Sequence, residues 1–240
     1  MSKNVAIFGS SGAIGDAFSK IFTEDDSINR IYNFSRKNIQ NTSEKVTNIY
    51  IDIVDENSIK KSSEEIPQDL RFDIVIVATG ILHNESDIFP EKSIRDITSK
   101  QMQDVFLVNT IGPTLIGKYF IPFLNKNDRS VFAFLSARVG SISENILGGW
   151  YSYRSSKTAL NQVIKNFSIE VKRSNPNAIF VGLQPGTVDS NLSSPFKKNV
   201  KSENLFSPSY SAMKLIEVIS SLDLNDSGKF IAWDGEEINP

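Results

Sequence analysis

A tyrosine and a lysine stand four residues apart in the segment Tyr153-Arg154-Ser155-Ser156-Lys157. On a helix this spacing puts the phenol and the ammonium on one face, one turn apart. A free phenol has a pKa of about 10, and lowering it to about 7 requires roughly 4 kcal/mol. An ammonium at about 5 Å, in an effective dielectric constant near 20, supplies on the order of 3 kcal/mol. The pair predicts a tyrosine that exchanges a proton with a substrate oxygen, and the alternative is a surface pair on an amphipathic helix.

Two further polar residues are candidates for the same chemistry. Ser136 follows the apolar run 131–135, where its hydroxyl can hydrogen-bond to a substrate carbonyl. Asn109 lies in the middle of a predicted helix, an unfavourable place because its side chain competes with the backbone for hydrogen bonds. Each also has a structural interpretation, in which Ser136 begins a turn and Asn109 satisfies a local kink. The candidate catalytic residues are Asn109, Ser136, Tyr153 and Lys157.

A glycine pattern follows the first apolar run of the chain, Val5–Phe8. It reads Gly9-Ser10-Ser11-Gly12-Ala13-Ile14-Gly15 and continues into a predicted helix over 13–22. Glycines allow the backbone to approach a pyrophosphate closely, and the free N–H groups of a helix N-terminus attract its charge. The pattern predicts a dinucleotide in contact with Gly9, Ser11, Gly12, Ile14 and Gly15. A tight turn between a strand and a helix, without a ligand, is the alternative.

The residues after the next two apolar runs indicate which dinucleotide is bound. The run 31–34 is followed by Arg36 and by no acidic side chain that could accept a hydrogen bond from a ribose 2′-hydroxyl. Arg36 can instead bind a 2′-phosphate through two hydrogen bonds. We therefore expect NADP, with NADPH favoured over NADH. Asp52 either accepts a hydrogen bond from the adenine amino group or caps the helix that begins after Asp55.

Seven short apolar runs alternate with helical stretches along the whole chain. They lie at 5–8, 31–34, 49–53, 74–78, 131–135, 179–183 and 230–233. Strands that are apolar throughout, rather than at alternate positions, are covered on both faces. The pattern predicts an α/β fold, a Rossmann-like doubly wound sheet of seven parallel strands with helices on both faces. We expect residues 1–240 to form a single NAD(P)-binding domain, since no linker or repeat interrupts them.

Two long helices and one long loop complete the predicted arrangement. One helix runs from about 99 to 124 with a kink at Gly112-Pro113, and the other runs from about 151 to 173. Their apolar surface predicts a homodimer or homotetramer formed through them, although burial in the core of one chain explains the pattern equally well. The stretch 186–206, rich in Ser, Pro and Lys, has no clear period and is typical of a substrate-binding loop.

Composition excludes several classes of function. The chain has 240 residues with 26 basic and 28 acidic side chains, and this net charge of −2 does not favour binding to nucleic acid. There is no cysteine and only one histidine, His83, so we expect neither thiolate chemistry nor a metal site. No apolar run is long enough for a signal peptide or a membrane span. We therefore expect a cytoplasmic protein that is not inserted in a membrane.

The ordered set of these residues resembles the short-chain dehydrogenase/reductase family over essentially the whole chain, and 141–154 is most similar to its C-factor-like subgroup. The motif matches are Gly9, Gly12, Gly15, Asp52, Gly80, Asn109, Ser136, Tyr153, Lys157 and Pro185-Gly186-Thr187. The resemblance implies that Tyr153 is the general acid/base and that Lys157 also holds the nicotinamide ribose. It further implies that Ser136 orients the substrate and that Asn109 anchors a water in a proton relay. Gly80 and Pro185-Gly186-Thr187 would contact the cofactor, with Thr187 at the nicotinamide carboxamide.

The residues and the resemblance together predict an NADP(H)-dependent oxidoreductase that interconverts a carbonyl and an alcohol on a small, partly apolar substrate. The side chains expected to line the substrate pocket are Ile142, Leu147, Trp150, Leu192 and Phe196. The alternative is a sensor or signalling protein that binds NADP(H) with little catalysis. A complete set of catalytic candidates weighs against it. The chain departs from the family where Asn-Asn-Ala-Gly is usual and Val77-Ala78-Thr79-Gly80 stands instead.

Overall fold

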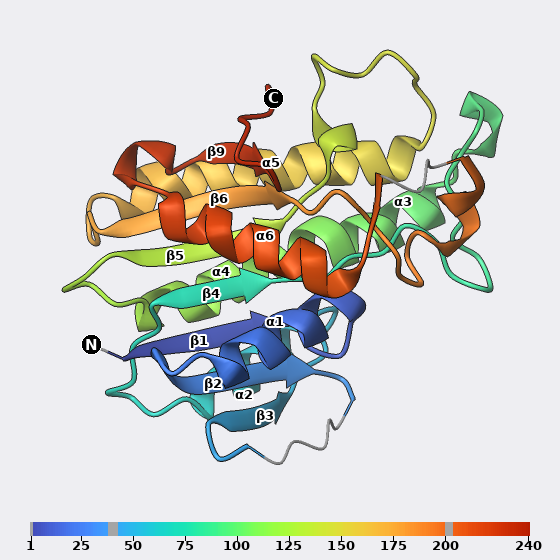
Figure 1. The fold of residues 1–240 in the computed structure, drawn as a ribbon. Helices are drawn as coiled ribbons and strands as arrows, with labels where there is room; N and C mark the ends of the chain where they lie inside the picture. The colour runs from blue at the N-terminus through green and yellow to red at the C-terminus, as the bar shows by residue number, and fades with distance from the viewer. Residues whose placement is uncertain (1, 38–42, 200–203) are drawn as a thin grey trace.

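The computed structural model describes residues 2–37, 43–199 and 204–240. Seven parallel strands form one sheet in the order β3-β2-β1-β4-β5-β6-β9, with helices on both faces (Figure 1). The strands are β1 (Lys3–Phe8), β2 (Ile28–Ser35), β3 (Val46–Tyr50), β4 (Ile74–Val77), β5 (Ser130–Leu135), β6 (Ala178–Gln184) and β9 (Lys229–Ala232). The predicted seven-stranded, doubly wound parallel sheet is confirmed.

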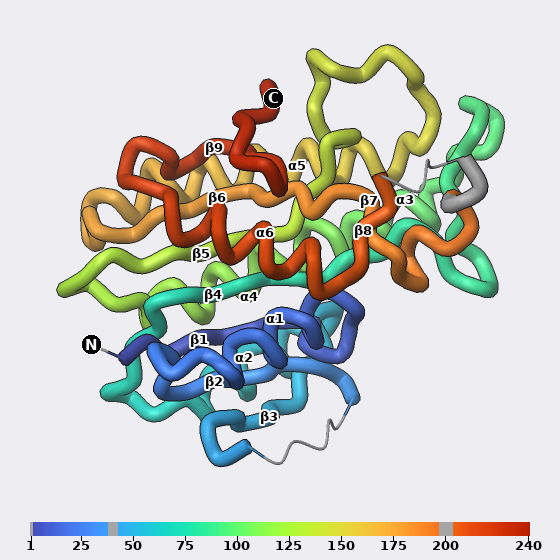
Figure 2. Tube along the Cα trace, in the orientation of Figure 1, coloured from blue at the N-terminus to red at the C-terminus, as the bar shows by residue number. Residues whose placement is uncertain are grey.

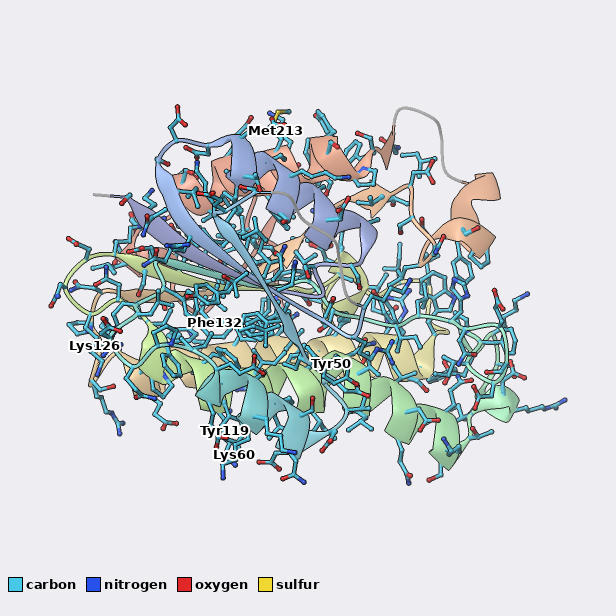
Figure 3. All side chains as sticks on the ribbon, turned by 90° about the horizontal axis from the view of Figure 1, so that it is seen from below. Tyr50, Lys60, Tyr119, Lys126, Phe132 and Met213 are labelled. Carbon is cyan, nitrogen blue, oxygen red and sulfur yellow. The ribbon has the colours of Figure 1, made fainter. Side chains whose placement is uncertain are left out.

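The helices form a layer on each face of the sheet. They are α1 (Ala13–Glu24) and α6 (Pro208–Ser221) on one face, and α2 (Glu56–Glu64), α4 (Gly112–Phe120) and α5 (Tyr151–Val171) on the other. Figure 3 shows Phe132 of β5 in the interior, whereas Lys60 of α2 and Met213 of α6 lie on the outside. Phe132 packs under α4 and α5 while its neighbour Ala133 packs under α1 and α6. Because both faces of β5 are covered, its apolar run is continuous.

The order of the strands reverses between β1 and β4. The chain adds β2 and β3 on one side of β1 and then returns to add β4, β5, β6 and β9 on the other. Phe8 at the end of β1 is in register with Val77 at the end of β4, so the segments that follow these strands leave the sheet side by side. Ligands of doubly wound sheets bind in the crevice at such a point. The fold thus brings the glycine turn next to residues 78–80.

The helix predicted over 99–124 is not α-helical throughout: its regular hydrogen bonding is interrupted directly before Gly112-Pro113, where a kink was predicted. A π-helical segment, Leu107–Ile111, joins α3 (Ser99–Phe106) to α4 and carries Asn109. Pro113 has no N–H to donate to the carbonyl of Asn109, so the α-helical hydrogen bond between them cannot form. The N–H of Gly112 donates to the carbonyl five residues earlier, at Leu107. Single π turns of this kind are frequent at functional sites.

Two details of the strands differ from the prediction. β3 ends at Tyr50 rather than at Ile53, because β2, its neighbour at this edge of the sheet, ends at Ser35 opposite Tyr50. The loop 186–206 contains two short parallel strands that the sequence did not predict, β7 (Thr187–Val188) and β8 (Leu205–Phe206) (Figure 2). Residues 200–203 of this loop lie outside the described residues.

Candidate active site

Tyr153 and Lys157 lie on the first turns of α5, at the carboxyl edge of the sheet. Both side chains are buried, with 8% and 3% of their surfaces exposed. The Lys157 Nζ atom lies 5.9 Å from the centre of the Tyr153 ring. It donates a hydrogen bond of 2.9 Å to the carbonyl oxygen of Leu135, the last residue of β5. The two residues therefore form a buried pair anchored on the sheet rather than a surface pair.

Burial determines the protonation of both groups. It raises the pKa of Tyr153 to about 12 and lowers the pKa of Lys157 to about 8, because each charged form loses its hydration. In the structure the loss of water around the phenolate outweighs its attraction to the ammonium. The lowering of this pKa towards 7 that is expected from Lys157 together with an oxidised nicotinamide ring stays a prediction. At neutral pH the phenol keeps its proton while Lys157 carries most of its charge. Tyr153 is thus set up to donate a proton.

Asn109 ties the loop after β4 to α5. Its Oδ1 atom accepts a hydrogen bond from the N–H of Ile81 at 2.7 Å, and its Nδ2 atom donates to the Ile81 carbonyl at 2.9 Å and to Ser156 Oγ at 3.1 Å. The side chain is fully buried. A Cβ atom at Gly80, directly before this clamp, would lie 3.5 Å from both Asn109 Oδ1 and Lys157 Nζ. The role of Asn109 in holding a water stays a prediction.

Ser136 is hydrogen-bonded to a residue of α5 that follows Tyr153 and Lys157 in the sequence. Its buried hydroxyl donates to Asn161 Oδ1 at 2.7 Å, one helical turn after Lys157. Its N–H donates to the Leu183 carbonyl of β6 at 2.8 Å. Among the hydrogen bonds found in the described parts of the chain, none joins Ser136 to Tyr153. The structure thus brings Ser136 to the interface between the sheet and α5, and its action on a substrate stays a prediction.

The glycine turn forms a cradle between β1 and α1 in which side chains have no room. A Cβ atom at Gly15 would lie 2.2 Å from the Gly9 carbonyl oxygen. Gly9 has a φ of +82°, and a Cβ atom there would lie 3.0 Å from the Ala78 carbonyl oxygen after β4. Gly12 is the N-cap residue of α1. The remaining predicted contacts at this turn are the exposed Ser11 and the half-buried Ile14. The tight packing therefore requires glycine at Gly9 and Gly15, while the exposed Ser11 and Gly12 leave the N-terminus of α1 accessible to a pyrophosphate.

The sequence did not predict Thr79 as a site residue, yet it faces this cradle. Its methyl carbon would lie 3.0 Å from a Cβ atom at Gly9. Its hydroxyl oxygen is buried and has no hydrogen-bond partner within the described residues. A buried hydroxyl without a partner is costly, and a ligand in the cradle would offset that cost. The glycine turn and this hydroxyl fit a dinucleotide. The sequence did mark Thr79 in one way: it belongs to Val77-Ala78-Thr79-Gly80 at the end of β4, where the family usually has Asn-Asn-Ala-Gly.

The residues predicted to bind the adenosine end lie after β2 and β3. Arg36 is exposed directly after β2. Asp52 is half-buried, and its Oδ1 atom accepts a hydrogen bond from the N–H of Val54 at 3.3 Å. The alternative that Asp52 caps the next helix is wrong, because Asp55 caps α2 by accepting from the N–H of Asn57 at 2.9 Å. The contacts of Arg36 and Asp52 with a cofactor stay predictions.

Pro185, Gly186 and Thr187 lie where β6 leads into the small β7–β8 sheet. Gly186 has a φ of +76°, and a Cβ atom there would lie 2.5 Å from the ring of Phe206, so the turn requires glycine. The carbonyl of Pro185 accepts a hydrogen bond of 2.7 Å from the hydroxyl of Ser211, which anchors the turn on α6. Thr187 is exposed, and its contact with a nicotinamide stays a prediction.

An aromatic cluster lies beside Tyr153. The centre of the Trp150 ring lies 6.3 Å from that of Tyr153 and 5.0 Å from that of Phe196. His83 reaches the cluster from the loop after β4, with its ring 5.9 Å from Phe196 and its Nε2 atom 2.9 Å from the Asn191 carbonyl oxygen. The structure thus brings Trp150 and Phe196 together, and adds His83, whose position no local sequence pattern reveals.

Ile142 and Leu147 lie outside this aromatic cluster in the contacts found among the described residues, and their contact with a substrate stays a prediction. Their side chains are 71% and 85% exposed on the loop that projects from the molecule before α5 (Figure 1). Hydrogen bonds inside the loop are local, such as the one from Gly148 N to Asn145 Oδ1 at 3.0 Å. Leu192 is 36% exposed, and its contact with a substrate stays a prediction.

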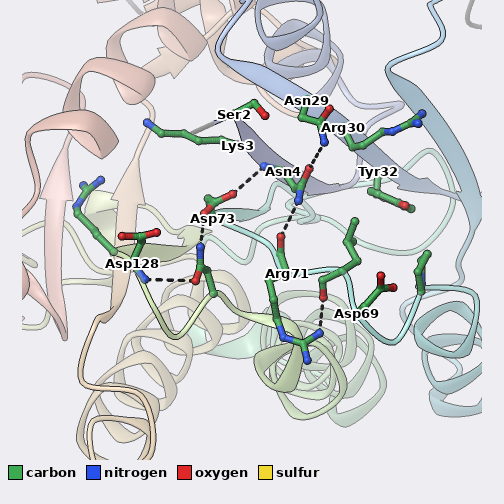
Figure 4. A pocket seen from close by; sticks show the side chains of 14 residues that line it. Ser2, Lys3, Asn4, Asn29, Arg30, Tyr32, Asp69, Arg71, Asp73 and Asp128 are labelled. Carbon is green, nitrogen blue, oxygen red and sulfur yellow. Dashed lines mark hydrogen bonds between the residues drawn. The ribbon is translucent and has the colours of Figure 1, made fainter.

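A polar hollow at the opposite end of the sheet is not a competing site. It lies around the amino ends of β1 and β4 and is lined by Asn4, Arg71 and Asp73 among others (Figure 4). These groups bind one another: the N–H of Asn4 donates to Asp73 Oδ2 at 2.8 Å, and Asn4 Nδ2 donates to the Arg71 carbonyl at 2.9 Å. The hydrogen bonds among these residues therefore hold the amino ends of the strands together. The candidate catalytic residues lie at the carboxyl ends of the strands.

Comparison with known proteins identifies the family. Residues 3–201 match the family model described as short chain dehydrogenase. The chain belongs to the short-chain dehydrogenase family. This confirms the predicted membership and the predicted enzyme class, an oxidoreductase, and it supports a nicotinamide cofactor.

Individual relatives of this short-chain dehydrogenase are consistent with the family assignment. It is 28% identical over 146 residues to C-signal of Myxococcus xanthus, across 61% of this chain and 82% of that protein, as the C-factor-like resemblance predicted. It is 31% identical over 140 residues to 1-hydroxy-2-glutathionyl-2-methyl-3-butene dehydrogenase of Rhodococcus sp. (strain AD45), across 58% and 57%. Its fold is similar to that of NADPH-bound carbonyl reductase from chicken fatty liver, with a TM-score of 0.86, 21% identity, and 100% and 99% of the two chains covered.

The buried charge of Lys157 should give folding stability a distinctive pH dependence. Because burial lowers the pKa of Lys157 from 10.5 to about 8, the unfolded chain binds this proton more tightly than the folded protein does. Stability therefore rises with pH between these two values. Relative to a Lys157→Met variant, we expect the wild type to gain stability between neutral pH and about pH 10, measured by thermal unfolding. Lys165→Met, at an exposed lysine of the same helix, should show no such change. A stability difference that is constant with pH would contradict the account.

Proposed function

We propose that this short-chain dehydrogenase is an NADP(H)-dependent oxidoreductase that interconverts a carbonyl and an alcohol on a small, partly apolar substrate. The observation that carries the proposal is the buried phenol of Tyr153 beside the buried ammonium of Lys157, at the sheet edge that also holds the glycine cradle. Titratable groups with shifted pKa values in a ligand crevice are typical of acid/base sites. The relative from Rhodococcus is named as a dehydrogenase and the chicken protein as a carbonyl reductase, which supports the reaction class.

Tyr153 acts as the general acid of the reduction. When bound, NADPH supplies a hydride to the carbonyl carbon. Tyr153 donates its phenolic proton to the carbonyl oxygen, so the substrate leaves as an alcohol and Tyr153 is left as a phenolate. The ammonium of Lys157, fixed by its hydrogen bond to Leu135, stabilises the negative charge that develops on the phenol. In the oxidation direction the phenolate takes the proton of the alcohol.

The surroundings of Tyr153 favour an apolar substrate. The rings of Trp150, Phe196 and His83 form a wall next to the phenol. Such a wall binds an apolar group and excludes water, which strengthens the interaction between Lys157 and the developing phenolate. In this proposal Asn109 holds the loop that carries Ile81, and Ser136 acts on the substrate only if its hydroxyl leaves Asn161.

Arg36 supports a preference for NADPH over NADH. It is exposed after β2, where the dinucleotide fold places the group that recognises the ribose 2′ position, and no acidic side chain stands there. A guanidinium can bind a 2′-phosphate through two charge-assisted hydrogen bonds. Asp52, at the end of the neighbouring segment, would accept a hydrogen bond from the adenine amino group.

Other properties expected from the sequence stay predictions. The homodimer or homotetramer through the two long helices is supported by Ile111 and Ile169, which are exposed on these helices. We further propose that residues 1–240 form a single domain, that the loop 186–206 binds the substrate and that the protein is cytoplasmic. Among the described residues no helix is long and apolar enough to cross a bilayer.

Replacement of Arg36 tests the cofactor preference. Arg36→Ala removes the proposed phosphate contact, so we expect the Kd for NADPH to rise about tenfold or more while the Kd for NADH stays nearly unchanged. Titration with both nucleotides, followed by fluorescence, measures these constants. Arg30→Ala, at an exposed arginine towards the other end of β2, is the matched control and should change neither. Equal affinity of the wild type for the two nucleotides would rule out the assignment.

Replacement of Tyr153 tests the mechanism. Tyr153→Phe keeps the ring but removes the proton, so we expect NADPH-dependent reduction of a panel of ketones and aldehydes to be lost. NADPH binding should persist, since the glycine cradle is unchanged. Substantial activity of the variant would show that another group is the acid. If the wild type binds NADPH tightly but reduces no carbonyl, the oxidoreductase proposal fails and the sensor alternative gains support.

A further inference from the structure

A buried carboxylate lies next to the start of α5. Glu91, in the loop between β4 and α3, has only 2% of its surface exposed. Among the ion pairs of the described residues, none involves Glu91. A carboxylate removed from water is costly unless hydrogen-bond donors satisfy it. The origin of those donors therefore indicates what this residue does.

The donors all come from the turn that begins α5. The N–H of Ser152 donates to the two carboxylate oxygens of Glu91 at 3.3 and 3.2 Å, and the hydroxyl of Ser152 donates to Oε1. The main-chain carbonyl of Glu91 accepts a hydrogen bond of 2.6 Å from the N–H of Trp150. A Cβ atom at Gly149 would lie 3.3 Å from that carbonyl. Glu91 thus clamps the turn 149–152 with both its side chain and its backbone.

The first turn of α5 lacks a cap of its own. Its N-cap residue is Trp150, whose side chain makes no capping hydrogen bond. The backbone of Trp150 has a φ of 51°, a left-handed conformation that is unfavourable for residues with a side chain. The free N–H groups at a helix start need acceptors, and a carboxylate there also interacts well with the helix dipole. Glu91 supplies this acceptor from 61 residues away in the sequence.

We propose that Glu91 is a positioning residue that holds Tyr153 and Trp150 in place for the reaction. The inference rests on the proposed function. Trp150 lies two residues before the clamped Ser152 and Tyr153 directly follows it. Their rings lie 6.3 Å apart, so release of this turn moves the proton donor and the substrate wall together. Small displacements of a reacting group cost large factors in rate. The clamp requires an acceptor oxygen at the distance from the backbone that the Glu91 side chain provides. Gln has an amide oxygen at the same distance and should preserve the hydrogen bonds with Ser152. Asp is one methylene shorter and should lose them.

The test compares Glu91→Gln, Glu91→Asp and Glu91→Ala in the reduction of the best ketone or aldehyde of the panel. We expect Ala and Asp to lower kcat by about tenfold or more, and Gln to stay within about threefold of the wild type. The KM for NADPH should change by less than about twofold in all three, because the glycine cradle is not touched. Glu85→Gln, at an exposed carboxylate of the same loop, is the matched control and should leave kcat unchanged.

Three kinetic results would overturn the inference. One is a folded Glu91→Ala variant with the kcat of the wild type, even if its melting temperature is lower. This would show that Glu91 caps α5 without affecting the position of Tyr153. Another is an equal loss in the Gln and Ala variants, which would show that the charge matters rather than the reach. If Glu91→Ala does not fold, Glu91→Gln and Glu91→Asp carry the comparison, and equal kcat values for these two would be the third.

Tryptophan fluorescence separates failure of this inference from failure of the proposed function. The chain has two tryptophans, so in a Trp233→Phe background Trp150 is the only reporter and needs no substrate. We expect Glu91→Asp to shift the Trp150 emission to longer wavelength, as the released ring meets water, and Glu91→Gln to leave it unchanged. If the wild type reduces no carbonyl, the proposed function fails while this signal still tests the clamp. Identical emission in the Asp variant and the wild type would overturn the clamp itself.

Discussion

A phenol and an ammonium lie buried next to each other on α5, and the chemistry of the site depends on what burial does to them. Removal from water disfavours both charged forms, so the pKa of Tyr153 rises while the pKa of Lys157 falls. The phenol consequently holds its proton at neutral pH and can act as a donor. In the proposed reaction the phenolate left after donation is costly in this place, and the charge of Lys157, held by the end of β5, would lower that cost.

The doubly wound sheet brings the other parts of the site to this pair. Because β1 and β4 end side by side, the glycine turn, Thr79 and the loop held by Asn109 meet at one edge of the sheet. The same loop continues to Glu91, which clamps the first turn of α5. The aromatic wall depends on that turn too, since Trp150 belongs to it. Loops that are distant in the sequence thus converge on one helix and fix the geometry of its first residues.

Local patterns were enough to predict the elements but not how distant segments pack against them. The strands were predictable because strands covered on both faces are apolar throughout. The interruption of the helix was predictable because Pro113 removes a helical hydrogen bond in any context. Tyr153 and Lys157, the candidate catalytic pair, also lie on one helix as their spacing predicted. The partner of Ser136 on α5, the exposure of Ile142 and the raised pKa of Tyr153 were not predictable, since each depends on which segments surround the side chain.

Ultraviolet titration of the wild type against Tyr153→Phe, without added cofactor, tests the central claim most directly. The difference between the two proteins reports the ionisation of this one phenol. If burial controls it, the difference spectrum should show no tyrosinate from Tyr153 below about pH 10, the pKa of a phenol in water. A tyrosinate signal from Tyr153 near neutral pH would contradict the account, because it would show that the ammonium rather than burial sets the state of the acid.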